Sequence, residues 1–441
     1  MLTPVARSSK HAVASINPAF SRISLSPLPP ASSRQVVVRS RRSNQPSRTV
    51  FTIAKKTSRR HLISEGSTTT PNEDKATSAS PSLNESPFYL ETGYSIFAKR
   101  PSRAFPPPFV SLPSGSFSDP LTTHNPIRGR RPFVNGAPVR GITNGDDAII
   151  IGDQNFLAVN DGVGAWAQKE RGHAALWSRL IAHFWAVEVE KSFVNGGKDV
   201  KLEDLNPIQN LQTAFEETKV ATRGKADAML EGERIETGEA PQPDKEKSEL
   251  KEAADAKDSS SNDILGTTTA SSALLHYKPS DPEPTPIVLA TTLGDCKVLI
   301  IRPSTSSVLY QSKEQWHWFD CPRQLGTNSP DTPVGNAVTD TVPVQADDLI
   351  AVLSDGVTDN LWEHEICSTL CDSVTKWVAG DAEAKDGMVY VARTLMNAAR
   401  EIAQDPNAES PYMERALDEG LPAEGGKLDD ISVLLGVVRK R

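Results

Sequence analysis

The stretch DDAIIIGDQNFLAVNDGVG, residues 146–164, combines two short apolar runs with acidic residues at both ends. The runs AIII and FLAV have the length of buried strands, and the four residues between them, GDQN, are typical of a turn. We therefore expect a β-hairpin here. Asp147 directly precedes the first run and Asp161 follows the second after Asn160, so each carboxylate is held by a rigid strand yet can reach a cleft.

Acidic residues border apolar runs or turns at several further places. Together with the hairpin they form the segments NGDD (144–147), NDGVG (160–164), GD (294–295), SDGVTD (354–359) and KLDD (427–430). Carboxylates brought to one site repel one another unless cations neutralise them. Oxygen ligands favour Mg²⁺ or Mn²⁺ over zinc, and the chain has no H-E-x-x-H or Cys/His ligand set. A single Asp-Gly is more typical of a turn than of a metal ligand, but the order and context of these segments favour a metal site.

The remaining apolar pattern predicts a mixture of short strands and longer helices. Strands are expected at 88–97, 349–353 and 431–438, with a second hairpin at 287–301 around the turn Gly294-Asp295-Cys296. Helices are expected at 176–190, near 208–215, at 366–374 and at 387–404. This order indicates an α+β layered domain and not a regular βαβ alternation.

The first residues and one internal segment differ in composition from this domain. Residues 1–64 contain no Asp or Glu but many Arg and Ser, which is typical of an organellar transit peptide; a basic tail that binds anionic partners is the alternative. We expect import into mitochondria, the matrix foremost, ahead of plastid or cytoplasm, with the import machinery as a partner. Residues 65–84 are predicted to be a linker and 85–441 the folded domain. Within that domain, residues 223–263 are predicted to be an acidic disordered insertion, either a surface loop or a regulatory docking segment.

Composition narrows the classes of partner. The formal net charge of -8 argues against a nucleic-acid partner, because phosphate backbones attract clustered Lys and Arg. No uncharged apolar run approaches the length of about 18 residues that a transmembrane helix needs, so no integral membrane segment is expected. The four cysteines form no CxxC pair and predict no disulfide framework.

Several motifs between about residues 85 and 440 carry a family resemblance. They are NGDDA (144–148), NDGVGAWA (160–167), GTTTA (266–270), LGDCKVLIIR (293–302), EQWHWFDCPRQL (314–325), LSDGVTDNLWEHEI (353–366) and GGKLDDISVLLGVV (425–438). In content and order they resemble the metal-dependent protein phosphatases, also called PPM or protein phosphatase type 2C, and most of all the organellar PTC-seven-like branch. The resemblance implies an α+β four-layer α-β-β-α sandwich, with two antiparallel sheets flanked by helices and a dinuclear metal site at one edge.

The same resemblance implies roles for individual residues. The implied ligands of two Mg²⁺ or Mn²⁺ ions are Asp146, Asp161, the carbonyl of Gly162, Asp355 and Asp429, with Asp295 and Asp359 at a weaker third site. Asp161 would bridge the two ions, and Asp147 would orient a metal-bound water. The implied activity is hydrolysis of phosphoserine or phosphothreonine in a phosphoprotein by metal-activated water, without a phosphoenzyme intermediate.

The chain departs from the family pattern on the substrate side of the site. Ile142 stands where many relatives have a phosphate-binding Arg, and Val163 where many have a His proposed as the general acid. In addition, Asp146 stands for a longer Glu, Ala165 for a Gly and Asp430 for an Asn.

We therefore expect another basic side chain to bind the phosphate. Arg140 is the first candidate, with Lys169 and Arg171 as further ones. His173 and His317 are conceivable proton donors, although a lone histidine is more often structural.

Two other functions are alternatives. One is a catalytically weak relative that binds phosphoproteins, and the other is a metal hydrolase of small phosphate esters. The acids at 146, 161, 355 and 429 favour an active enzyme over a weak relative, because clustered like charges are costly to keep.

Overall fold

The computed structural model describes residues 86–106, 108–110, 132–195, 200–224 and 263–441. All of them belong to one unit of the chain, which spans 54–441. The predicted transit peptide, the linker and most of the acidic insertion lie outside the described residues, and stay predictions.

One antiparallel sheet has five strands in the order β1, β17, β16, β10, β11. These are β1 (Phe88–Phe97), β10 (Lys297–Arg302), β11 (Ser307–Gln311), β16 (Leu349–Leu353) and β17 (Ile431–Lys440). The expected strands at 88–97, 349–353 and 431–438 are thereby confirmed. β1 pairs with β17 along its whole length, from Phe88 opposite Lys440 to Phe97 opposite Ile431.

The second antiparallel sheet has six strands in the order β15, β9, β8, β6, β5, β4. These are β4 (Ile142–Asn144), β5 (Asp147–Gly152), β6 (Phe156–Asn160), β8 (Ala270–Lys278), β9 (Thr285–Leu293) and β15 (Val338–Pro343). β5 and β6 form the predicted hairpin, with Ile149 opposite Val159. Its turn residues Gln154 and Asn155 have φ of 61° and 60°, as a tight hairpin turn requires.

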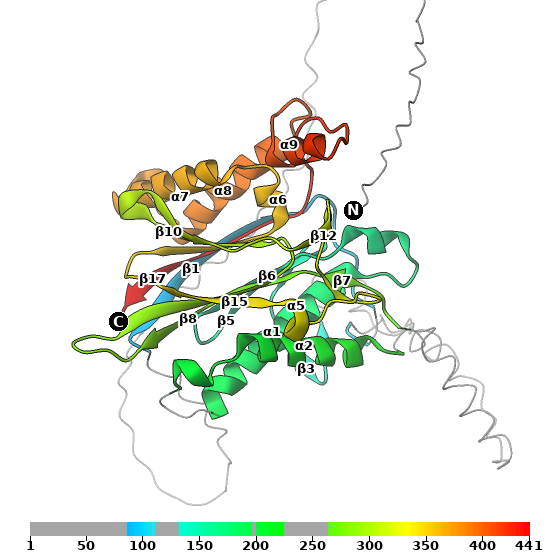
Figure 1. The fold of residues 1–441 in the computed structure, drawn as a ribbon, viewed down its shortest axis with the longest axis horizontal. Coiled ribbons are helices and arrows are strands. Elements are labelled where there is room, and N and C mark those ends of the chain that lie inside the picture. Colours follow the sequence, from blue (N-terminus) through cyan, green and yellow to red (C-terminus); the bar gives the residue numbers. More distant parts are fainter. Residues whose placement is uncertain (1–85, 107, 111–131, 196–199, 225–262) are drawn as a thin grey trace, which may run out of the picture. The chain divides into compact units, whose positions relative to one another are not determined.

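Helices cover the outer face of each sheet (Figure 1). α1 (Ala174–Asn195) and α2 (Pro207–Thr222) share a buried apolar cluster with the six-stranded sheet, and α7 (Glu363–Val378) and α8 (Met388–Ala403) share another with the five-stranded sheet. A third cluster draws on both sheets, for example Leu157 and Leu434. The four predicted helices are confirmed, and α1 is longer than expected at both ends.

The predicted second hairpin at 287–301 is wrong. β9 pairs with β8 and β15 in one sheet, whereas β10 pairs with β11 and β16 in the other, so the chain crosses between sheets at 294–296. Two apolar runs joined by a short turn do not reveal their pairing partners when both strands are buried. Gly294 takes φ of 108° at this crossing, and Asp295 is buried beside it instead of lying at an exposed hairpin tip.

Short elements complete the described part of the chain. They are β2 (Phe133–Val134), β3 (Ala137–Pro138), β7 (Thr267–Thr268), β12 (Trp316–Trp318), β13 (Cys321–Pro322), β14 (Leu325–Gly326), α5 (Pro333–Asn336), α6 (Asp355–Thr358) and α9 (Pro411–Asp418). Among the described residues, no helix combines the length and the apolar character that crossing a membrane demands.

Candidate metal centre

The predicted aspartates gather where strands of the two sheets begin or end. Asp147 opens β5, Asp161 follows β6, Asp295 lies between β9 and β10, Asp355 opens α6 just after β16, and Asp429 and Asp430 precede β17. Antiparallel neighbours run in opposite directions, so the start of one strand lies beside the end of the next. The alternating strand directions therefore explain how acids from distant parts of the sequence reach one region.

A polar contact joins the two sheets at this region. Asn144 Nδ2 donates to the carbonyl of Ile431 (3.0 Å) and to Oγ of Ser432 (2.9 Å). Ser432 Oγ in turn donates to Oδ2 of Asp147 (2.8 Å). Asp147 is almost fully buried, and burial together with the charge of Asp430 raises its pKa well above the usual value.

Asp161 is held at the end of β6 by two threonines. Its N–H donates to Oγ1 of Thr269 (3.0 Å), and its carbonyl accepts from Oγ1 of Thr268 (2.7 Å). Carboxylate oxygens of Asp161 and Asp295 and the Sγ of Cys296 all lie within 4.8 Å of one another. Burial, and then the charge of a neighbouring aspartate, raises the pKa of both Asp161 and Asp295 well above the usual value.

Cys296 was not among the predicted site residues. Burial raises the pKa of its thiol, and its Sγ lies 3.2 Å from Oγ1 of Thr269. A thiol kept neutral is a poor ligand for a hard cation, so we assign it to the packing around Asp161.

The Lys427 ammonium lies among four carboxylates. Its Nζ is 2.7 Å from Asp359, 3.0 Å from Asp355, 3.1 Å from Asp320 and 3.8 Å from Asp429. Burial alone would raise the pKa of Asp355, but Lys427 outweighs it and lowers that pKa. At Asp359 burial dominates and raises the pKa to about 7, although Lys427 opposes it.

Lys99 and Arg100 follow the end of β1 after one intervening residue and contact two acids of the cluster, Asp429 and Asp146. Lys99 Nζ forms an ion pair with Asp429, and Arg100 Nη2 lies 2.5 Å from Oδ2 of Asp146. Asp430 accepts the N–H of Lys99 (2.8 Å) and that of Asp146 (2.9 Å), so it ties the two segments together.

Glycines at two positions allow backbone segments to lie close to the acidic residues. Gly145 has φ of 63°, and a Cβ there would lie 2.1 Å from Oδ1 of Asp430. A Cβ on Gly162 would lie 2.3 Å from the carbonyl oxygen of Asp146. Since both clashes involve atoms of the acidic site itself, a larger side chain would displace the site.

The residues present fit hard divalent cations. The Oδ1 atoms of Asp147 and Asp295 are buried and have no hydrogen-bond partner among the described residues. Such orphaned acceptors are rare unless an ion or a water completes them. The carboxylates in the region also outnumber the basic side chains that contact them, which are Lys99, Arg100, Arg415 and Lys427. Oxygen donors carrying excess negative charge are the ligand set that Mg²⁺ and Mn²⁺ prefer.

The predicted phosphate-binding and acid candidates have other partners. The Arg140 guanidinium pairs with Glu190 of α1 (2.7 Å), and Arg171 donates to the carbonyl of Asp263 (3.3 Å). His173 Nε2 lies 3.0 Å from the carbonyl of Ala104, and His317 Nε2 lies 2.7 Å from Oδ2 of Asp331. Lys169 is exposed beside the short 3₁₀ turn Gly164–Gln168.

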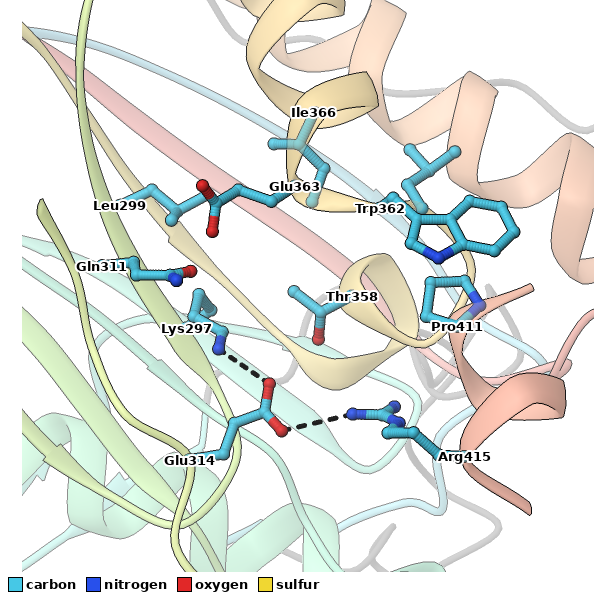
Figure 2. A pocket seen from close by; sticks show the side chains of 11 residues that line it. Lys297, Leu299, Gln311, Glu314, Thr358, Trp362, Glu363, Ile366, Pro411 and Arg415 are labelled. Carbon is cyan, nitrogen blue, oxygen red and sulfur yellow. Dashed lines mark hydrogen bonds and ion pairs between the residues drawn. The ribbon is translucent and has the colours of Figure 1, made fainter. Parts of the chain in front are cut away.

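A pocket of about 180 Å³ adjoins the acidic cluster (Figure 2). Glu314 lies between Lys297 (2.7 Å) and Arg415 (3.2 Å) at its base. Arg415 also forms an ion pair with Asp359, so one arginine connects the pocket to the cluster.

Sequence reasoning missed the basic residues that contact the acids. Lys427 stood inside the quoted motif GGKLDD, and Lys99 and Arg100 stood at the end of the predicted first strand. Their partners are remote in sequence, since Lys99 and Asp429 are 330 positions apart. Only the pairing of β1 with β17 brings them together.

Comparison with known proteins confirms the resemblance. The chain is related to type 2C protein phosphatases: it is 27% identical over 335 residues to probable protein phosphatase 2C 80 of Arabidopsis thaliana, covering 74% of this chain and 64% of that protein. PTC7 homologues are among these relatives, and the human one is 34% identical over 154 residues, covering 33% of this chain and 47% of that protein. The chain thus spans less than two thirds of the length of either relative.

Family models, a further relative and solved structures were also compared with the chain. No family model matches the chain. Probable protein phosphatase 2C 1 of Oryza sativa subsp. japonica is 25% identical over 315 residues, which cover 68% of this chain and 72% of that protein. Among solved structures, the photosystem II phosphatase PBCP aligns with a TM-score of 0.48 at 21% identity, covering 79% of this chain and 99% of that chain.

Proposed function

We propose that this chain is a metal-dependent protein phosphatase that hydrolyses phosphoserine and phosphothreonine in phosphoprotein substrates. The observation that carries the proposal is that Asp161, Asp295, Asp355 and Asp429 gather near strand ends, with Asp359 just after α6, and that buried oxygens among neighbouring acids lack a partner among the described residues. The type 2C phosphatases to which the chain is related support the same activity.

In this proposal two Mg²⁺ or Mn²⁺ ions are held by Asp146, Asp161, the carbonyl of Gly162, Asp355 and Asp429, and a weaker third ion by Asp295 and Asp359. When bound, such ions would lower the pKa of a water molecule and neutralise charge on the phosphoryl oxygens.

The chain's own residues position these groups. Thr268 and Thr269 fix the backbone of Asp161, and Ser432 fixes one oxygen of Asp147. That contact leaves Oδ1 of Asp147 as an acceptor, and we propose that this atom orients the attacking water. Asp161 and Asp147 are therefore the acids whose loss should affect the reaction most directly.

The finer features of the fold and location belong to the same proposal. Two sheets with a shared core and helices on their outer faces are what a four-layer α-β-β-α sandwich with a metal site at one edge requires. We propose residues 85–441 as the phosphatase domain and residues 1–64 as a transit peptide that import machinery recognises. Mitochondria, the matrix foremost, are the proposed location, in keeping with the PTC7 homologues among the relatives.

The test is Mn²⁺-dependent hydrolysis of a phosphothreonine peptide by wild type, Asp161→Asn and Asp355→Asn. Loss of an outer partner of a metal ligand already costs about 10- to 100-fold, so we expect loss of a proposed ligand itself to lower kcat/KM by at least about 100-fold. Asp386→Asn is the control, because Asp386 is exposed and pairs only with Arg393 on the described surface.

Two outcomes would contradict the proposal. Wild-type protein without Mn²⁺-dependent turnover would indicate a phosphoprotein-binding relative. Faster turnover of small phosphate esters than of phosphopeptides would indicate the other alternative.

A further inference from the structure

A basic segment, residues 99–103, crosses the outer side of the acidic cluster. Its start is fixed by the N–H of Lys99, which donates to Oδ1 of Asp430 (2.8 Å). Its end is fixed by Arg103, whose guanidinium donates to the carbonyls of Gly172 (2.8 Å) and Ala167 (3.0 Å). Because both ends are anchored, Arg100 between them is presented to the cluster in a defined position.

Arg100 is the most exposed of the basic side chains that contact the cluster. Its side chain is 46% exposed, against 22% for Lys99, 33% for Arg415 and 19% for Lys427. Lys427 is also surrounded by several carboxylates, whereas Arg100 pairs with one carboxylate among the described residues, that of Asp146. Of the four, Arg100 is therefore the side chain most accessible to a molecule arriving from solvent.

Gly164 lies beside Arg100, whose Nη2 donates to its carbonyl (3.5 Å). A Cβ placed on Gly164 would lie 3.5 Å from Arg100 Nη2, 3.7 Å from Oδ2 of Asp146 and 3.7 Å from Lys99 Nζ. The Cα of Gly164 therefore lies at a point that two cationic groups and one acid of the cluster border. An anion that approached the cluster at this point would have both cations within reach.

We propose that the Arg100 guanidinium binds the phosphoryl oxygens of the substrate, with the Lys99 ammonium behind it; this inference rests on the proposed phosphatase function. A phosphate dianion that approaches a cluster of carboxylates is repelled unless positive charge offsets them, and cationic side chains at the edge of the cluster add to the charge that bound metal ions would supply. A guanidinium suits this role, because its N–H groups can donate in parallel to two phosphate oxygens. Arg140, the first candidate from the sequence, is instead held by Glu190 at 2.7 Å.

The pairing of Arg100 with Asp146 fits the same role. If Asp146 binds a divalent cation, that cation neutralises the carboxylate in place of the guanidinium. Nη2 of Arg100 is then free to donate to a phosphate oxygen. In this proposal Arg100 exchanges Asp146 for the substrate phosphate, while the contacts of Lys99 and Arg103 hold segment 99–103 in place.

The experiment titrates inorganic phosphate into the Mn²⁺-loaded full-length protein by calorimetry and measures KM and kcat on a phosphothreonine peptide. The variants are Arg100→Ala, Arg100→Lys and the control Arg393→Ala, which removes another exposed arginine that pairs with an aspartate at 2.7 Å. Charge-assisted hydrogen bonds of this kind predict that Arg100→Ala weakens phosphate binding and raises KM by about 10- to 100-fold. Arg100→Lys should recover part of the loss, and Arg393→Ala should match wild type within about twofold.

Two results would overturn the inference. One is a phosphate affinity for Arg100→Ala equal to that of wild type. The other is a loss of Mn²⁺ affinity in Arg100→Ala, measured in a separate titration, which would make Arg100 a support for Asp146 and not a substrate-binding residue. The phosphate titration needs no turnover, so a wild type that binds phosphate without hydrolysing the peptide would refute the proposed function and still decide the role of Arg100.

Discussion

Replacing Lys427 by methionine should lower the stability of the metal-free protein and raise its affinity for Mn²⁺. The ammonium lies within 3.1 Å of carboxylate oxygens of Asp320, Asp355 and Asp359 and 3.8 Å from Asp429. Methionine keeps much of the side-chain volume but removes the charge. Asp355, Asp359 and Asp429 are also proposed metal ligands, so the lysine and the metal compete for them.

The size of the stability loss follows from the burial of these groups. Removing one partner of a buried ion pair typically costs about 3–5 kcal/mol. The cluster can relieve part of this cost by taking up a proton, since burial already raises the pKa of Asp359 to about 7. We therefore expect a loss near the lower end, about 3 kcal/mol, which for a domain of this size lowers Tm by roughly 6 °C.

The effect on metal affinity has the opposite sign. A cation that must first displace the ammonium binds more weakly than one that finds its ligands free. Asp320 lies at the rim and is 47% exposed, so a displaced Lys427 can keep one partner and the competition is partial. We expect Lys427→Met to bind Mn²⁺ about tenfold more tightly than wild type.

Calorimetric titration of Mn²⁺ and thermal unfolding in EDTA and in saturating Mn²⁺ measure both effects. Lys297→Met is the matched control, because Lys297 is similarly enclosed but pairs with Glu314 (2.7 Å). The Tm difference between Lys427→Met and wild type should shrink in saturating Mn²⁺. An Mn²⁺ affinity no higher than that of wild type, together with a lower Tm in EDTA, would refute competition and leave Lys427 a structural ion-pair partner.

Two further predictions concern parts of the fold away from the acidic cluster. Burial, with help from nearby arginine charges, lowers the pKa of His183 from 6.5 to about 4, and its Nδ1 accepts the N–H of Arg140 (3.1 Å). The unfolded chain therefore binds the extra proton between these values, so stability should fall by roughly 3 kcal/mol as pH drops from about 6.5 to 4. Urea unfolding of His183→Asn should show a shallower pH dependence, and an equal one would contradict this. A Cβ on Gly93 would lie 2.4 Å from the carbonyl carbon of Met388, so Gly93→Ala should cost about 3 kcal/mol in urea unfolding. A Cβ on Gly436 would meet only leucine methyls at 3.2–3.3 Å, so Gly436→Ala should cost less than about 1.5 kcal/mol, and a reversed order would refute the packing argument.

The elements with a strong local pattern could be predicted from the sequence. The runs around GDQN contain both the strands and the turn of the β5–β6 hairpin, and the helices 363–378 and 388–403 each have one apolar face. The predicted hairpin at 287–301 failed because pairing depends on partners elsewhere in the chain. β9 and β10 are both buried on two faces, so their apolar pattern contains no information about which sheet each one joins.

The acidic residues of the candidate site could be predicted from the sequence, because they stand beside the ends of apolar runs that form strands. Its basic residues were not, because Lys99 meets Asp429 only through the sheet that joins the first and last described strands. Arg140 illustrates the reverse error. It is close in sequence to the acidic pair at 146–147, yet its guanidinium pairs with Glu190 of α1.

The pairing of β1 with β17 has a consequence for the order in which this protein can fold during synthesis. β17 lies between β1 and β16, so neither strand has its shared neighbour until residues 431–440 have been made. β1 must therefore remain without this neighbour while residues 98–430 are made. Contacts between segments so far apart in sequence form slowly, because a very long loop has to close. The five-stranded sheet of a nascent chain should consequently remain open and accessible to chaperones until β17 emerges.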